Sequence, residues 1–350
     1  MKKLLNTLYI TTPEAYLTKD GTNIVVSVSG KEVFRIPVQN VQSVITFGYM
    51  GVSPGMMKLC ADNGVSISFH TPQGKFISRL QGPINGNVLL RTRQYSLLTD
   101  HLMASRLASL TVTAKIYNSR VTLRRFVRDY PERQGHAEVI DASNRLGKYY
   151  RQTRHTTDDI ALLRGLEGES ASVYFKVFRH LILRGEKEFA FNGRNRRPPT
   201  DIVNAMLSFG YSLLASDCTA ALEGVGLDPA VGYMHTLRPG RPSLALDLME
   251  ELRSYIVDRF VLSMINNRKI SPSDFHIHTA TDDPNPASVM LTEAGRKNFL
   301  GAWQTKKRTE IIHPFLNEKV SLGLLPHVQA MLLARYLRGD LDDYPVFLSK

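Results

Sequence analysis

The stretch "GYMHTLRPGRPSLALDLMEELR", residues 232–253, decides how the second half of the chain is organised, because it joins a stiff loop to an apolar helix. Pro239 and Pro242 lack N–H groups and Gly240 relaxes the backbone, so "RPGRP" predicts a loop and excludes both a helix and a central strand. A helix is expected to follow, with Ser243 as its N-cap and Leu244 as its first apolar residue.

Two carboxylates, Asp247 and Glu250, lie inside this apolar helix. At about 100° per residue they share one side with Ser254 and Asp258, opposite the leucine-rich side. A solvent-exposed polar face is therefore one interpretation of these acidic residues. Leu246 places apolar surface beside Glu250, which leaves room for a second interpretation, a binding site.

The loop before the helix brings further polar groups to the same place. His235 lies on this loop, and Arg238 and Arg241 lie between it and the helix. Imidazole, carboxylate and guanidinium groups at one point suit a metal ion and a phosphate.

The composition indicates a globular chain with an anionic partner. The 350 residues are 43% hydrophobic and carry a formal net charge of +12, with a pI near 9.6. Two domains with full cores fit this length, and the charge favours a polyanionic partner, with a merely basic soluble protein as the alternative. The loop "NGRNRRPPT", residues 192–200, makes Arg196 and Arg197 candidate DNA contacts; a solvated connection is the alternative.

Cysteine usage and the N-terminus indicate a soluble, cytoplasmic protein. Cys60 and Cys218 are far apart and outside any CxxC pattern, so neither a disulfide framework nor a zinc site is expected. Polar residues interrupt the apolar run after Lys3, and no stretch reaches the roughly 18 apolar residues of a membrane span.

The chain is expected to be an α+β protein with two parts. Short β-branched segments with the hairpin turns "KDGTN" and "SGKE" predict a small β-rich domain over residues 1–80, with one short helix at "SPGMMKLCADNG". A linker over 81–88 follows. Helical periodicity then predicts a larger, mostly α-helical domain over residues 89–350.

A second acidic candidate lies in "LRGLEGESASVYF", residues 163–175, where Gly165 and Gly168 flank Glu167. Each glycine in a helix costs about 1 kcal/mol relative to alanine, so close approach of another backbone or of a ligand is expected there. The alternative is a surface glutamate in a loosely built helix.

Several motifs of well-known enzyme classes are absent from the sequence. The sequence has no GxxxxGK[ST], no GxSxG and no dinucleotide fingerprint, which excludes nucleotide hydrolysis and serine hydrolase chemistry of those types. His276 and His278 of "DFHIH" share a strand face but have no further zinc ligands nearby in sequence. Glu167, His235 and a carboxylate of the 243–253 helix remain, and this oxygen-rich set suits Mg²⁺ or Mn²⁺.

Three blocks, "LRGLEGESASVYF", "RRPPTDIVNAMLSFGYSLL" and "VGYMHTLRPGRPSLALDLMEELR", follow a small β domain in this order. Together they resemble the CRISPR-associated endonuclease and integrase family, the larger subunit of the spacer-acquisition complex, and most closely its subtype I-C branch. The resemblance covers essentially the whole chain. It implies a homodimer with a β-rich dimerisation domain, a small ferredoxin-like partner subunit, and metal-dependent cleavage and strand transfer. The substrates would be double-stranded DNA fragments and the repeat array.

The resemblance also assigns roles to individual residues. It places the catalytic metal ligands at Glu167, His235 and Glu250, where many family members have aspartate at the third position. Asp247, one turn earlier, is expected to support Glu250 or to take its place.

Two other functions fit the same residues. A free-standing, structure-selective nuclease would use water in place of the 3′-hydroxyl. A basic architectural DNA-binding protein would leave the carboxylates on the surface, although acidic groups facing DNA repel it unless a cation intervenes.

Overall fold

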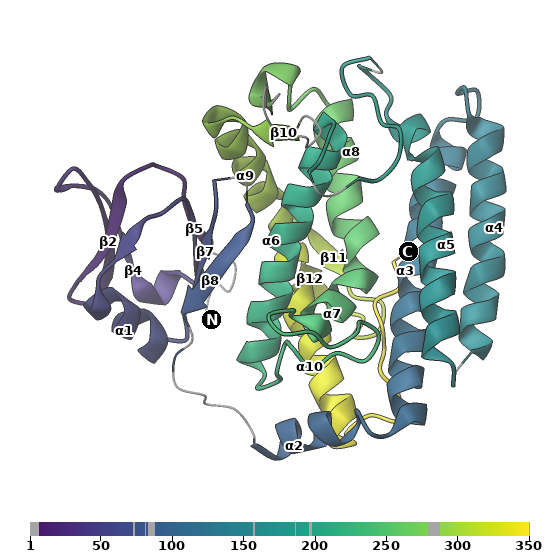
Figure 1. The fold of residues 1–350 in the computed structure, drawn as a ribbon, viewed down its shortest axis with the longest axis horizontal. Coiled ribbons are helices and arrows are strands. Elements are labelled where there is room, and N and C mark those ends of the chain that lie inside the picture. Colours follow the sequence, from purple (N-terminus) through teal and green to yellow (C-terminus); the bar gives the residue numbers. More distant parts are fainter. Residues whose placement is uncertain are drawn as a thin grey trace. The chain divides into compact units, whose positions relative to one another are not determined.

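The computed structural model describes residues 7–349 except 73, 81, 83–87, 157, 186, 196–197 and 279–287, and it divides the chain into two compact units (Figure 1). The first unit contains residues up to 85 together with 291–309 and 321–324, and the second contains the rest. The predicted α+β class, with a β-rich N-terminal part and a larger helical part, is confirmed. The sequence-based division placed 291–309 in the helical domain, whereas the structure groups it with the β strands.

The first unit contains two four-stranded sheets, with strand orders β1-β5-β7-β8 and β4-β3-β2-β6. Their elements are β1 (Thr7–Ile10), β2 (Ala15–Asp20), β3 (Asn23–Val28), β4 (Lys31–Pro37), η1 (Val38–Asn40), β5 (Ser43–Phe47), β6 (Gly51–Val52), α1 (Pro54–Asp62), β7 (Ser66–His70) and β8 (Phe76–Leu80). In the first sheet β1, β5 and β7 are parallel and β8 is antiparallel to β7. Apolar side chains from both sheets and from α1 form one buried core.

The local predictions for this unit hold. Both hairpins form, and their turns contain Gly21 and Gly30 at φ of +57° and +76°, a conformation that favours glycine. The short helix α1 begins after Ser53, whose hydroxyl accepts a hydrogen bond from the Met56 N–H at 3.2 Å.

Helix α9 (Glu293–Lys307) belongs to this unit because its side chains meet the first sheet. The Gln304 amide donates a hydrogen bond to the Thr7 carbonyl at 2.8 Å, and the Arg296 guanidinium lies 5.8 Å from the centre of the Phe47 ring. Trp303 is buried. Periodicity identifies such a helix, but it does not indicate which of two cores the helix joins.

The second unit is mostly helical. It contains α2 (Val88–Ser96), α3 (His101–Asp129), α4 (His136–His155), α5 (Ile160–Val177), η2 (Phe178–Leu181), α6 (Ile202–Gly224), α7 (Ser243–Arg253), the π-helical turn η3 (Ser254–Asp258), α8 (Arg259–Asn266), η4 (Pro272–Asp274) and α10 (Leu325–Arg338). Two short strand pairs complete the chain, β9 (Phe275–His278) with β10 (Ser288–Leu291) and β11 (Glu310–Ile312) with β12 (Lys319–Ser321), and η5 (Leu322–Leu324) lies in the first unit. No helix in the described ranges combines the length and apolar character that crossing a bilayer requires.

Helix α7 is buried on nearly all sides, which contradicts the solvent-exposed interpretation of its acidic face. It packs against α3, α6 and α10, so Asp247, Glu250, Ser254 and Asp258 are at most 4% exposed. The expected N-cap is also wrong: Ser243 is the first helical residue, and its hydroxyl donates to the Thr236 carbonyl at 3.3 Å instead of capping the helix.

Candidate metal site

Asp247 fixes the loop that carries His235. Its carboxylate accepts hydrogen bonds from the backbone N–H groups of Tyr233, Met234 and His235, at 2.7, 3.0 and 3.0 Å. The same carboxylate lies 2.6 Å from His235 Nδ1. Because Nδ1 is held in this way, Nε2 is the ring nitrogen left to act at the site, and it lies 3.9 Å from Glu250 Oε1.

Two other residues hold the loop against the helices. A Cβ atom at Gly232 would lie 2.7 Å from Asp247 Oδ2 and 2.6 Å from the Ser243 carbonyl carbon, so only glycine permits this close approach. The Arg164 guanidinium of α5 donates to the Met234 carbonyl at 2.6 Å. The position of His235 is therefore set from both α5 and α7.

Glu167 and Glu250 meet at one lysine. Glu167 lies on α5 with a side chain that is 22% exposed, and Glu250 lies on α7 with a side chain that is 3% exposed. The Lys115 ammonium, from the middle of α3, contacts Glu167 Oε1 and lies 2.7 Å from Glu250 Oε2. Three helices thus converge at this point of the second unit.

Arg253 is the second cation at Glu250. Its Nη2 atom lies 2.9 Å from Glu250 Oε1, and its guanidinium lies 4.8 Å from the centre of the Tyr211 ring. Burial raises the pKa of Glu250, but the charges of Arg253, Lys115 and His235 outweigh burial and hold that pKa below its ordinary value. Glu250 is therefore ionised at neutral pH, as a metal ligand must be.

The chemical types of these side chains suit a divalent metal ion. Two carboxylates and an imidazole whose second nitrogen contacts a carboxylate are typical ligands of such ions. Glu250 Oε2 is buried, and its ion-pair partner among the described residues is the Lys115 ammonium. Within the same residues, no three His, Cys, Asp or Glu side chains already surround one point, because the Lys115 ammonium lies between Glu167 and Glu250.

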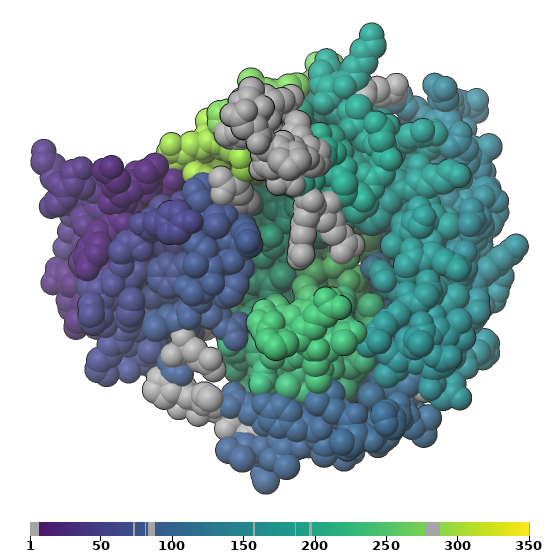
Figure 2. Space-filling model, in the orientation of Figure 1, coloured from purple at the N-terminus to yellow at the C-terminus, as the bar shows by residue number. Residues whose placement is uncertain are grey.

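Two of the candidate DNA contacts lie on the loop that carries His235. Arg238 is exposed and Arg241 is half-buried on the loop before α7, whose green surface lies beside the teal surface of α5 in Figure 2. Arg196 and Arg197 lie outside the described residues. His276 and His278 are the other histidines that the sequence suggested as possible metal ligands. His276 is exposed, and the side chain of His278 lies outside the described part of the chain.

Sequence reasoning missed Lys115, Arg253 and Arg164. A signal for Lys115 exists, because it is the only charged residue between Arg106 and Arg120 in a long helical segment. Arg253 follows Glu250 by one i,i+3 step, which is also a recognisable pairing. Nothing in the sequence distinguishes Arg164 from other surface arginines.

Comparisons with known proteins agree on one family. The sequence profile described as CRISPR associated protein Cas1 matches residues 8–305. A CRISPR-associated endonuclease Cas1 of Chlorobaculum tepidum is 46% identical over 99% of both chains, and one of Rhodospirillum rubrum is 47% identical over 100% of both.

Solved structures with the same fold include two more distant proteins. A CAS1 protein from Thermotoga maritima has a TM-score of 0.80 at 22% identity and covers 99% of this chain and 100% of its own. A casposase bound to integration product has a TM-score of 0.79 at 23% identity, over 96% of this chain and 92% of its own.

Proposed function

The chain belongs to the Cas1 family, and from this premise we propose that it is a DNA endonuclease and integrase of CRISPR adaptation. It joins the 3′-hydroxyl ends of captured double-stranded DNA fragments to the repeat array by transesterification. The observation that carries the proposal is the convergence of Glu167 and Glu250 at one point, with His235 Nε2 3.9 Å from Glu250 Oε1.

The residues at this point have different proposed roles. Glu167, His235 and Glu250 would hold Mg²⁺ or Mn²⁺, and the bound ion would supply a Lewis acid for the phosphodiester chemistry. Asp247 orients His235 through the contact at Nδ1. Arg238 and Arg241, on the adjoining loop, offset the negative charge of the DNA backbone.

The family and the charge support the partners and the location that we propose. The net charge of +12 supports binding to double-stranded DNA along the phosphate backbone, with Arg196 and Arg197 among the contacts. The proposal includes a homodimer formed through the β-rich unit, a small ferredoxin-like adaptation subunit, membership of the subtype I-C branch and a cytoplasmic location. The domain assignment, β-rich dimerisation followed by helical catalysis, belongs to the same proposal.

The experiment that tests this function mixes the protein and the small subunit with short duplexes that have free 3′-hydroxyls. A supercoiled plasmid carrying a repeat and either Mn²⁺ or Mg²⁺ complete the mixture. We expect covalent joining of the duplex to the plasmid, seen as a labelled, relaxed product.

Two other results would each contradict the proposal. Nicking without joining would indicate a free-standing nuclease, in which water replaces the 3′-hydroxyl. DNA binding without any metal-dependent cleavage would indicate an architectural protein.

The glycines that flank Glu167 provide a further prediction. Within the described residues, a Cβ atom at Gly165 or Gly168 would meet no atom within 4 Å, so close approach of a neighbouring backbone does not explain them. Approach of DNA is the explanation that we propose, and a loosely built surface helix is the alternative. Gly165→Ala and Gly168→Ala should stabilise the helix by about 0.5–1 kcal/mol. We expect strand joining to fall nonetheless, because the added methyl groups would occupy the exposed face of α5 that DNA approaches in this proposal.

Thermal unfolding and the joining assay, on the same samples, separate these two effects. Gly301→Ala on α9 is the matched control, since a Cβ atom there also meets no described atom within 4 Å. It should change stability alone. Full joining by both α5 variants would show that the glycines have no part in DNA approach.

A further inference from the structure

The position of Lys115 is unusual for a lysine. Its side chain is only 9% exposed, and it ends between the two carboxylates that the proposed function assigns to a metal ion. A buried ammonium requires compensating charge, and Glu167 and Glu250 supply it. We propose that Lys115 is a positioning residue, an internal counter-ion that holds Glu167 and Glu250 together until a divalent cation displaces it.

The charges at the site support displacement of Lys115 in particular. Arg253 pairs with Glu250 Oε1 and lies against the Tyr211 ring, so it is held on two sides and stays in place. Lys115 instead contacts Glu250 Oε2, for which it is the one ion-pair partner among the described residues, and it also contacts Glu167. A cation that binds both carboxylates therefore competes with Lys115 and leaves the Arg253 contact intact.

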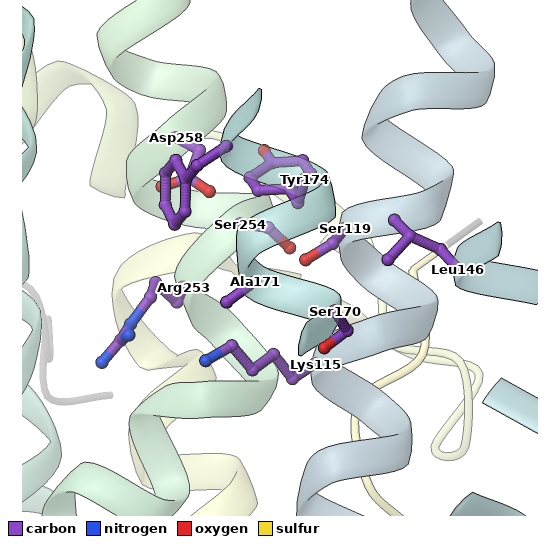
Figure 3. A pocket seen from close by; sticks show the side chains of 10 residues that line it. Lys115, Ser119, Leu146, Ser170, Ala171, Tyr174, Arg253, Ser254 and Asp258 are labelled. Atoms are coloured by element: carbon purple, nitrogen blue, oxygen red, sulfur yellow. The ribbon is translucent and has the colours of Figure 1, made fainter. Parts of the chain in front are cut away.

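The surroundings of Lys115 indicate to which side its ammonium turns when a cation displaces it. In Figure 3 its side chain extends from α3 past Ala171, and a small cavity lies beside it, lined among others by Ser119, Ser254 and Leu146. That cavity is about 10 Å³, which is the room that about one water molecule needs. The displaced ammonium therefore turns to the open side of the site, where Glu167 is 22% exposed.

This inference rests on the proposed metal site, and the first test is metal affinity. Binding of Mn²⁺, measured by calorimetry or by electron paramagnetic resonance, should be about tenfold tighter or more in Lys115→Met than in the unchanged chain, because a charge-assisted contact no longer competes. Lys115→Arg keeps the charge and should not gain affinity. Lys58→Met removes an exposed lysine that pairs with Asp62 on α1 and serves as the matched control.

The second test needs no variant, so it holds even if Lys115→Met fails to fold. Acylation of lysine side chains, followed by mass spectrometry, should modify Lys115 slowly without metal and several times faster with saturating Mn²⁺. Unchanged protection of Lys115 with Mn²⁺ bound, or unchanged affinity in a folded Lys115→Met chain, would overturn the inference. Absence of Mn²⁺ binding to the unchanged chain would instead overturn the metal site of the proposed function.

Discussion

Glu250→Ala and Glu167→Ala should each reduce cleavage and joining by more than about 100-fold, because each removes a proposed metal ligand, and removal of a supporting partner alone costs roughly 10- to 100-fold in affinity. His235→Ala should do the same. The Glu250 and Glu167 variants should differ in their free energy of unfolding. Glu250 is 3% exposed and pairs with both Arg253 and Lys115, whereas Glu167 is 22% exposed and pairs with Lys115.

Loss of the Glu250 carboxylate leaves a buried guanidinium without its partner, which costs about 3–5 kcal/mol. Loss of the Glu167 carboxylate should cost less in the free energy of unfolding, since Lys115 still has its ion pair with Glu250. Chemical denaturation of both variants measures this difference, and Glu250→Gln, which keeps the shape of the side chain, should recover part of the stability and none of the activity. A Glu250→Gln chain that joins DNA normally would remove Glu250 from the ligand set.

The sequence predicted the acidic and imidazole groups that the structure brings together in the candidate site, because each lies in a recognisable local pattern. His235 lies in a loop stiffened by Pro239, and Glu167 lies between two glycines. The resemblance to a known family then joined these segments, which periodicity alone could not do. Their convergence on one point depends on how α3, α5 and α7 pack, and that packing is a property of the folded second unit.

Burial of the acidic face of α7 could not be predicted for the same reason. An amphipathic helix and a helix enclosed on all sides differ in their neighbours, and Asp247 and Glu250 look like solvated residues until α3, α6 and α10 surround them. Lys115 was missed because the opposite charge that compensates it comes from helices distant in sequence. The membership of α9 in the β-rich unit is likewise a long-range property.

The distinction between Asp247 and Glu250 leads to the second large effect. Asp247 is 4% exposed, and its hydrogen bonds to described residues are all with the loop: three backbone N–H groups and His235 Nδ1. Asp247→Ala leaves those N–H donors without their acceptor, and each buried donor that loses its partner costs about 1–3 kcal/mol. We expect a loss of about 3 kcal/mol or more in the free energy of unfolding.

The same change should weaken Mn²⁺ binding by roughly 10- to 100-fold, because His235 loses the carboxylate that orients its ring. Asp247→Asn keeps one acceptor oxygen but turns an NH₂ group toward backbone donors, so it should recover only part of the stability. Denaturation and metal titration on the two variants separate support from direct ligation. If Asp247→Ala keeps its stability and loses all metal binding while Glu250→Ala binds metal normally, Asp247 is the third ligand, and the contacts of Glu250 with Lys115 and Arg253 serve only to stabilise the fold.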